Sequence, residues 1–174
     1  MSTAKLFIPD SHVVDILGST KGRDQPIMLM EKAIDLVSLI EDSAVEDPNA
    51  VFLDPFCKAG EILLATALRV CLLSSAHKGR LTSVDQVFRE LYGGRYYAIA
   101  PDERHFFLSR RTFYGNSNSH DDQITKHIIN GNYLSDTDGR LDKDKFLKEL
   151  GNMLNHIRKN NPNARIVAVG NPPY

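Results

Sequence analysis

Four short apolar segments, separated by longer stretches with helical periodicity, constrain the fold more than any other feature of this sequence. The apolar segments are residues 51–53, 95–100, 127–129 and 164–169. The stretches with apolar residues at helical spacing are 26–40, 61–74, 84–91, 103–112 and 146–159. Strand-like segments that alternate with helices are typical of βαβ units, in which the strands run parallel. We therefore predict an α/β fold: a Rossmann-like, doubly wound and mostly parallel sheet.

Length and composition limit the classes of protein that fit. With 174 residues, of which 42% are hydrophobic, the chain can bury one core. The formal net charge is −1, so any contact with nucleic acid must come from a local patch or from another part of the protein. Cys57 and Cys71 form no Cys-x-x-Cys pair, which fits a reducing compartment and predicts no metal site. There is no signal-peptide pattern and no apolar run of membrane-spanning length, so we predict a cytoplasmic protein without membrane contact.

The first apolar segment runs directly into a turn that is suited to binding a ligand. Residues 51–53 are followed by Asp-Pro-Phe-Cys-Lys-Ala-Gly at 54–60, and then by a predicted helix. The end of a parallel strand frees backbone amides, Pro55 stiffens the turn, and Gly60 allows a ligand to approach the backbone closely. Asp54 is then placed to hold an ammonium or hydroxyl group. The alternative is an ordinary strand-to-helix turn, because short glycine-containing loops are weak evidence of a site.

The last apolar segment runs into a second and more specific motif, Asn-Pro-Pro-Tyr at residues 171–174. Two prolines fix the backbone and remove two donors, so carbonyl oxygens and the Asn171 amide converge as acceptors on one amino group. Tyr174 supplies a flat face for a base. Acceptors that draw the hydrogens of a ring-conjugated amine out of the ring plane make it more reactive, so no general base is obligatory. The alternative is a polyproline-type tail or part of a proline-rich ligand motif.

The two motifs, and their order, resemble those of DNA methyltransferases that use S-adenosylmethionine to methylate N6 of adenine. In that family an Asp-Pro-x-Cys-Gly-x-Gly loop binds the methionine end of the cofactor, and Asn-Pro-Pro-Tyr holds the target amine and stacks on the base. The amine is otherwise paired inside the duplex, so the resemblance implies double-stranded DNA with a flipped adenine as the partner. Residues 54–60, 99–103, 108–115 and 128–134 also resemble a subgroup of large restriction-modification methylases.

The resemblance implies roles for individual residues. The implied catalytic residues are Asn171, Pro172, Pro173 and Tyr174. The implied cofactor-binding residues are Gln25, Pro26, Asp54, Pro55, Phe56, Cys57, Gly60, Asp102 and Asn132. Gln25-Pro26 is similar to a Thr-Pro segment that closes over the methionine moiety, and residues 131–134 are similar to the segment beside the adenine of the cofactor. No metal is implied.

Two positions depart from the pattern of the family. Lys58 stands where the loop usually has its first glycine, although a lysine also occurs there in the subgroup. Ala100 stands where the family generally places an acid for the ribose hydroxyls. Asp102 or Glu103 could substitute for that acid, or both could simply open the following helix, where acids favour the N-terminal dipole.

The sequence also suggests that the domain continues beyond Tyr174. A final strand at residues 164–169 would otherwise be left as an unpaired sheet edge, which is a liability. We therefore expect residues 1–24 to be an N-terminal extension and residues 25–174 to be an incomplete methyltransferase domain. The rest of the sheet and the target-recognition region are expected in the remainder of the enzyme.

Three other functions remain open from the sequence. RNA guanine-N2 methyltransferases carry similar motifs, but they usually have an RNA-binding domain in front, and only residues 1–53 precede the loop here. Methyltransferases that act on protein glutamine usually pair Asn-Pro-Pro-Tyr with a more glycine-rich loop. An inactive or truncated methyltransferase-like scaffold is the non-enzymatic alternative, because a fold does not determine a function.

Overall fold

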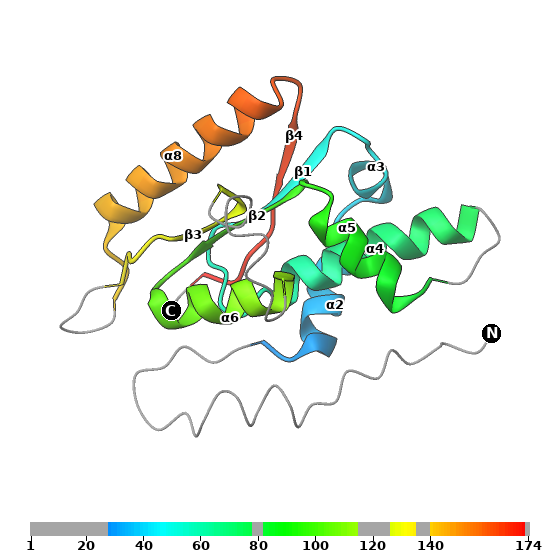
Figure 1. The fold of residues 1–174 in the computed structure, drawn as a ribbon, viewed down its shortest axis with the longest axis horizontal. Helices are drawn as coiled ribbons and strands as arrows, with labels where there is room; N and C mark the ends of the chain where they lie inside the picture. The colour runs from blue at the N-terminus through cyan, green and yellow to red at the C-terminus, as the bar shows by residue number, and fades with distance from the viewer. Residues whose placement is uncertain (1–27, 78–81, 115–125, 135–139, 173–174) are drawn as a thin grey trace.

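A four-stranded parallel sheet forms the centre of the computed structural model, which describes residues 28–77, 82–114, 126–134 and 140–172 (Figure 1). The strands are β1 (Ala50–Asp54), β2 (Tyr96–Ala100), β3 (Ile128–Asn130) and β4 (Arg165–Ala168). Their order in the sheet is β3-β2-β1-β4. The chain adds β2 and β3 on one side of β1 and then returns to add β4 on the other side. The strand order therefore reverses between β1 and β4, which is where doubly wound sheets bind ligands.

Helices cover both faces of this sheet. They are α2 (Met30–Ser38), α3 (Asp42–Val45), α4 (Glu61–His77), α5 (Val84–Tyr92), α6 (Glu103–Tyr114) and α8 (Lys143–Asn160). Figure 1 shows α8 on one face and α2, α4, α5 and α6 on the other. The predicted fold class, a doubly wound Rossmann-like α/β fold, is thus confirmed.

Along the central strands, side chains point to the two faces of the sheet in turn. Each layer of helices therefore packs against its own apolar surface. Phe52 and Tyr96 belong to the core shared with α2, α4, α5 and α6. Val51 and Leu53 belong to the core on the α8 side, where Ile157 is fully buried. Successive strand residues point to opposite faces, and every residue of β1 and β2 is buried, as expected for parallel strands covered on both sides. Each large side chain in these cores contributes roughly 1.5–3 kcal/mol by its burial.

The structure differs from the predicted elements in three places. The helix predicted over 26–40 begins only at Met30, after Leu29 in an extended conformation. The predicted polar break at 41–50 contains the short helix α3, because Ala44 and Val45 are buried and give this turn a packed face. His127 lies in a helical turn, so β3 begins one residue later than predicted. The polar loop predicted at 115–122 lies outside the described residues.

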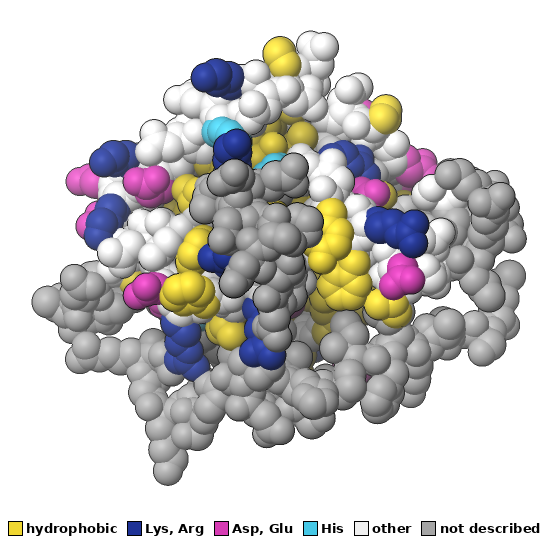
Figure 2. Space-filling model, viewed as in Figure 1, with side chains coloured by type: hydrophobic (Ala, Val, Ile, Leu, Met, Phe, Trp, Pro, Cys, Tyr) yellow, Lys and Arg dark blue, Asp and Glu magenta, His cyan; other side chains and the backbone are white. Residues whose placement is uncertain are grey.

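The described helices and one face of the described surface bear on contact with membranes and nucleic acid. No helix among the described residues is both long and apolar enough to cross a membrane. On the face in Figure 2, the described Lys and Arg side chains are interspersed with Asp and Glu. Within the described part of the sheet, β4 pairs with β1 alone and is an edge strand, as the sequence predicted.

Candidate functional site

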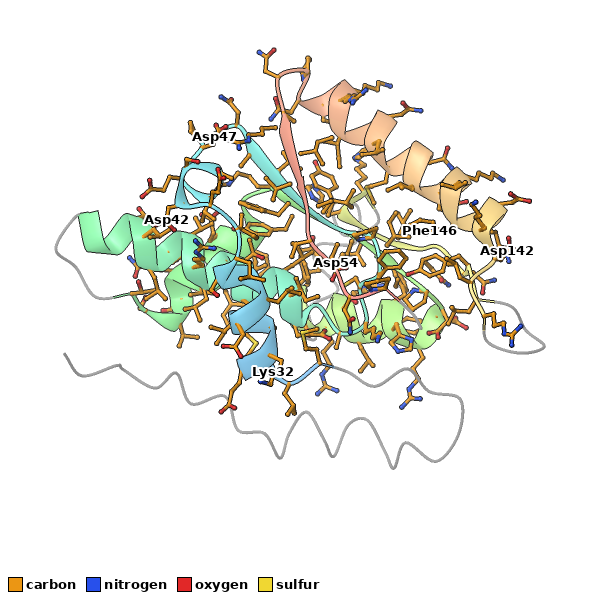
Figure 3. The ribbon with its side chains drawn as sticks, turned by 180° about the vertical axis from the view of Figure 1, so that it is seen from behind. Lys32, Asp42, Asp47, Asp54, Asp142 and Phe146 are labelled. Carbon is orange, nitrogen blue, oxygen red and sulfur yellow. The ribbon has the colours of Figure 1, made fainter. Side chains whose placement is uncertain are left out.

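The ends of β1 and β4 bring the turn that begins at Asp54 next to the residue in front of Asn-Pro-Pro-Tyr, at the carboxyl edge of the sheet. The Val169 N–H donates to the Leu53 carbonyl oxygen over 2.9 Å, which continues the pairing past the end of β4. At the next residue, Gly170, an added Cβ would lie 2.8 Å from Asp54 Oδ1 and 3.2 Å from Pro55 Cδ. Figure 3 shows Asp54 beside the segment that leaves β4. Asn171 is therefore one residue from direct contact with the Asp54 turn.

Asp54 is a buried acid whose partners within the chain offset only part of the effect of its burial. Its side chain is 2% exposed, and its Oδ1 accepts a hydrogen bond from the Phe56 N–H over 3.0 Å. Among the described residues it takes part in no ion pair. Burial raises the pKa of Asp54 to about 8 and the Glu61 charge adds to this rise, whereas the Phe56 hydrogen bond, the Lys58 charge and a hydrogen bond from Cys57 oppose it. A buried acid of this kind is stabilised by a ligand that brings a positive charge.

The turn from Asp54 to Gly60, hereafter the β1 turn, is held from several sides. The Cys57 N–H donates to the Ile99 carbonyl oxygen of β2 over 3.1 Å. Cys57 is fully buried, and burial raises the pKa of its thiol well above the ordinary value, so it packs without acting as a nucleophile. Gly60 has φ +86°, a conformation that favours glycine, and begins the path into α4.

Glu61 links the β1 turn to the segment in front of α2. One carboxylate oxygen accepts the Ala59 N–H over 2.9 Å, and the other accepts the Met28 N–H over 3.0 Å. Gln25 and Pro26, predicted to contact the cofactor, lie outside the described residues. Met28 shows that the chain just after them meets the β1 turn.

On the β2 side of the site, Asp102 caps helix α6. Its Oδ1 accepts the His105 N–H over 2.8 Å, and both carboxylate oxygens lie 2.8 Å from His105 Nδ1. Burial alone would raise the pKa of Asp102, but the hydrogen bonds from His105 outweigh it, so the pKa is lowered. The capping role considered from the sequence is therefore present. A ribose contact by this ionised and partly exposed carboxylate stays a prediction.

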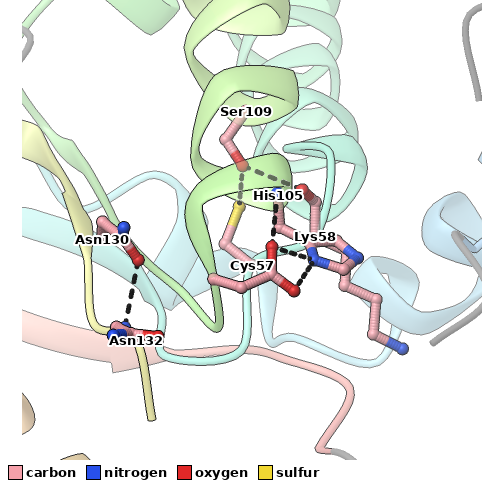
Figure 4. Close-up of polar contacts among 7 residues, drawn as sticks. Cys57, Lys58, His105, Ser109, Asn130 and Asn132 are labelled. Carbon is pink, nitrogen blue, oxygen red and sulfur yellow. Dashed lines mark hydrogen bonds and ion pairs between the residues drawn. The ribbon is translucent and has the colours of Figure 1, made fainter. Parts of the chain in front are cut away.

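The segment after β3 reaches the same edge. The Gly131 N–H donates to the Ala100 carbonyl oxygen over 2.8 Å, and an added Cβ on Gly131 would lie 2.7 Å from the Ile99 side chain. Asn132 is exposed, has φ +42°, and donates its N–H to Asn130 Oδ1 over 3.1 Å (Figure 4). This predicted cofactor residue thus lies on the accessible rim of the site.

An aromatic cluster joins the β1 turn to both β3 and α8. The Tyr133 hydroxyl donates to the Pro55 carbonyl oxygen over 3.1 Å, and its ring is fully buried. Phe56 stacks on Phe146 of α8 with 4.8 Å between ring centroids, and Tyr133 meets both rings edge-on. Pro55 and Phe56, predicted as cofactor residues, are half-buried and hold the backbone of the turn in place.

The target side of the site is described as far as Pro172. Asn171 is half-buried and Pro172 is exposed. Pro173 and Tyr174 lie outside the described residues. The structure therefore brings together Asp54, Cys57, Gly60, Asn132 and Asn171 at one sheet edge, with Asp102 at the start of the adjacent helix.

Several residues of this site were missed from the sequence. Glu61, Tyr133 and Gly170 act through contacts with positions far away in the chain, and Ser109 does so from the middle of α6. A glycine directly in front of Asn-Pro-Pro-Tyr was a usable signal, since it permits close approach of two backbones. The other three have no local pattern that marks them.

A metal-binding cluster and a cavity are the other features that could mark a functional site. Among the described residues, no group of three or more His, Cys, Asp or Glu is arranged to hold a metal ion. A cavity of about 530 Å³ lies at the opposite, amino edge of the sheet, where Cys71, Glu90 and Arg95 are among the lining residues. Glu90 and Arg95 form an ion pair there.

Comparison with known proteins supports the fold. No family model and no curated protein matches this chain. Among solved structures, the chain is similar to an ATP-dependent type ISP restriction-modification enzyme, LlaBIII, bound to DNA, with 18% sequence identity and a TM-score of 0.51. The match covers 89% of this chain and 11% of that enzyme. The chain therefore spans about a tenth of the length of that enzyme, and the likeness concerns the fold.

Proposed function

We propose that this chain is part of a methyltransferase that transfers a methyl group from S-adenosylmethionine to N6 of adenine in DNA, within a restriction-modification enzyme. The observation that carries the proposal is the contact of Gly170 with Asp54, which puts the two motifs against each other where the strand order reverses. A solved structure with a similar fold is a restriction-modification enzyme bound to DNA, which supports the substrate class.

The carboxyl edge fits the chemistry of the cofactor. S-adenosylmethionine supplies an activated methyl group on a sulfonium. The buried carboxylate of Asp54 suits the ammonium of its methionine end. Asp102 lies at the start of α6, next along the sheet, and suits a ribose hydroxyl. Asn132, on the rim beyond β3, suits the adenine end.

Asn171 suits the target amine. In this proposal its side-chain oxygen and the carbonyl groups of the following prolines accept the two amine hydrogens, while Tyr174 stacks on the base. The amine and the methyl group must be held in line at near-attack distance, and two turns packed against each other can fix that geometry. Proximity and orientation then supply much of the rate.

The test is a transfer assay with tritiated S-adenosylmethionine and the protein at its full natural length. Duplex DNA, RNA of the same sequence and protein extract are offered as acceptors, and the methylated product is identified after digestion. We expect N6-methyladenine in DNA. Methylated guanine in RNA or methylated glutamine would replace the proposal with one of the two related functions, and no transfer to any acceptor would favour the scaffold.

Asn171→Ala tests the catalytic assignment within the same assay. We expect a loss of about 100-fold or more in the rate of transfer, with cofactor affinity within about threefold of wild type. Asn163→Ala is the matched control, because Asn163 is exposed just before β4, at the other end of that strand. Equal rates for the two variants would contradict the role of Asn171.

A further inference from the structure

Ser109 is a fully buried hydroxyl in the middle of α6 that contacts two consecutive residues of the β1 turn. It donates to the Lys58 carbonyl oxygen over 3.2 Å, and its Oγ lies 3.2 Å from Cys57 Sγ (Figure 4). The Cys57 N–H is held separately by the Ile99 carbonyl oxygen. Cys57 is thus fixed from β2 on one side and from α6 on the other.

The same face of α6 shapes the end of the turn. Phe113 lies one helical turn after Ser109, and residues four apart share a helix face. An added Cβ on Gly60 would lie 3.0 Å from the Phe113 ring and 3.3 Å from Thr112 Cβ. The helix therefore touches the β1 turn at Cys57, at Lys58 and at Gly60.

A second buried hydroxyl in the structure behaves differently. Thr66 is also fully buried, but it donates to the Ile62 carbonyl oxygen, four residues earlier in its own helix. That is the usual partner of a hydroxyl inside a helix. Ser109 instead donates across to a residue 51 positions away. Serine is a mediocre helix former, so its presence here is explained by the contact with the turn.

We propose that Ser109 is a positioning residue that sets the backbone of the β1 turn for ligand binding. Lys58 stands where the related loops have a glycine, and a residue with a side chain has fewer backbone conformations to choose from. The hydrogen bond to its carbonyl group fixes one of them. The effect on cofactor affinity rests on the proposed function, whereas the effect on the turn itself does not.

The first experiment measures the reaction of Cys57 with an aromatic disulfide, in a Cys71→Ala background so that Cys57 is the only thiol. We expect Ser109→Ala to speed this reaction about tenfold, because both contacts of the Ser109 hydroxyl with the turn, at Cys57 and at Lys58, are lost. Thr66→Val is the matched control and should react at the rate of the parent. An unchanged rate in Ser109→Ala overturns the proposal, whether or not the chain binds a cofactor.

The second experiment is a calorimetric titration of the same proteins with S-adenosylmethionine, well below their unfolding temperatures. We expect about tenfold weaker binding for Ser109→Ala and unchanged binding for Thr66→Val. Absence of binding by wild type would contradict the proposed function and leave the thiol experiment to decide the role of Ser109. Binding by wild type and equal binding by Ser109→Ala would contradict the positioning role alone.

A second variant covers the case in which Ser109→Ala does not unfold cooperatively. Ser109→Cys keeps a group of similar size but a weaker donor. It is expected to weaken S-adenosylmethionine binding about threefold, and binding equal to that of wild type would overturn the proposal.

Discussion

Asp47, three residues before β1, and Asp54, the last residue of β1, lie in different electrostatic surroundings. At the amino edge, Asp47 lies among arginines: its carbonyl oxygen accepts a hydrogen bond from Arg95 over 3.3 Å, and its carboxylate lies 3.9 Å from Arg165 Nη1. At the carboxyl edge, Asp54 is buried, and the charge of Lys58 only partly offsets the rise in the pKa of Asp54 that burial causes. Figure 3 shows the two residues at opposite ends of the strand. The amino edge is neutralised within the chain, whereas the carboxyl edge suits a cationic ligand.

The contrast between the two edges also explains why the cavity at the amino edge is not the better candidate for a ligand site. The cavity of about 530 Å³ at the amino edge is lined in part by Glu90 and Arg95, which already bind each other. The Tyr96 hydroxyl also donates to Glu90, over 3.0 Å. Polar groups that are satisfied within the protein offer a ligand little, so chemistry and not volume distinguishes the two edges.

The largest expected effect concerns the charge of Asp54. The unfolded chain releases this proton near the ordinary pKa of 3.8, whereas burial holds it in the folded protein until about pH 8. Between these values the folded state binds more protons, so stability falls as pH rises, by roughly 1 kcal/mol per pH unit. Asp54→Asn removes this titration while keeping the shape of the side chain. Its unfolding free energy should therefore vary less between pH 4 and pH 8, as measured by denaturant unfolding.

Asp47→Asn is the control for that measurement, because it makes the same change at the other end of β1. It is expected to keep the slope of the wild-type profile. If Asp54→Asn kept that slope as well, Asp54 would not be a buried acid with a raised pKa.

The next effect in size concerns the amino edge. Glu90 accepts hydrogen bonds from Arg95 and from the Tyr96 hydroxyl, and all three groups are largely buried. Glu90→Ala leaves two donors without their acceptor and should cost about 2–3 kcal/mol of stability, or roughly 5–10 °C in Tm. Affinity for S-adenosylmethionine should stay within about twofold of wild type. A large loss of affinity, with the fold intact, would show that the amino edge also contributes to the binding of S-adenosylmethionine.

The smallest effect concerns the packing between the two motifs. Gly170→Ala places a methyl group 2.8 Å from Asp54 Oδ1, so the two turns must move apart, at a cost of about 1–3 kcal/mol. We expect about tenfold weaker binding of S-adenosylmethionine by calorimetry. Gly151→Ala in α8 is the control, because an added Cβ there meets nothing within 4 Å and should stabilise the helix by about 0.5–1 kcal/mol. Equal affinities in the two variants would show that the contact at Gly170 is unimportant.

The sequence predicted those parts of the structure that depend on local pattern. The apolar runs that end at Asp54 and in front of Asn171 are adjacent strands, and because these strands are parallel, both turns lie at one edge. Helix α3 was missed because four residues are too few to show a helical period, and its burial depends on packing against α4.

The contacts that hold the site together could not be predicted in this way. Ser109 and Lys58 are 51 positions apart, and the Tyr133 hydroxyl meets the Pro55 carbonyl oxygen across 78 positions. Such pairs depend on how the helices pack over the sheet, which no local pattern records. The roles assigned to Asp54, Asp102, Asn132 and Asn171 stay predictions for experiment to test.

The most direct test of the carboxyl edge as the cofactor site is a calorimetric titration of this chain with S-adenosylmethionine. Asp54→Ala and Asp47→Ala are titrated beside the wild type. We predict saturable binding that Asp54→Ala weakens by at least about thirtyfold, equivalent to about 2 kcal/mol, and that Asp47→Ala leaves within about twofold of wild type. Absence of binding by the wild type, or equal losses in the two variants, would contradict the assignment of the carboxyl edge as the cofactor site.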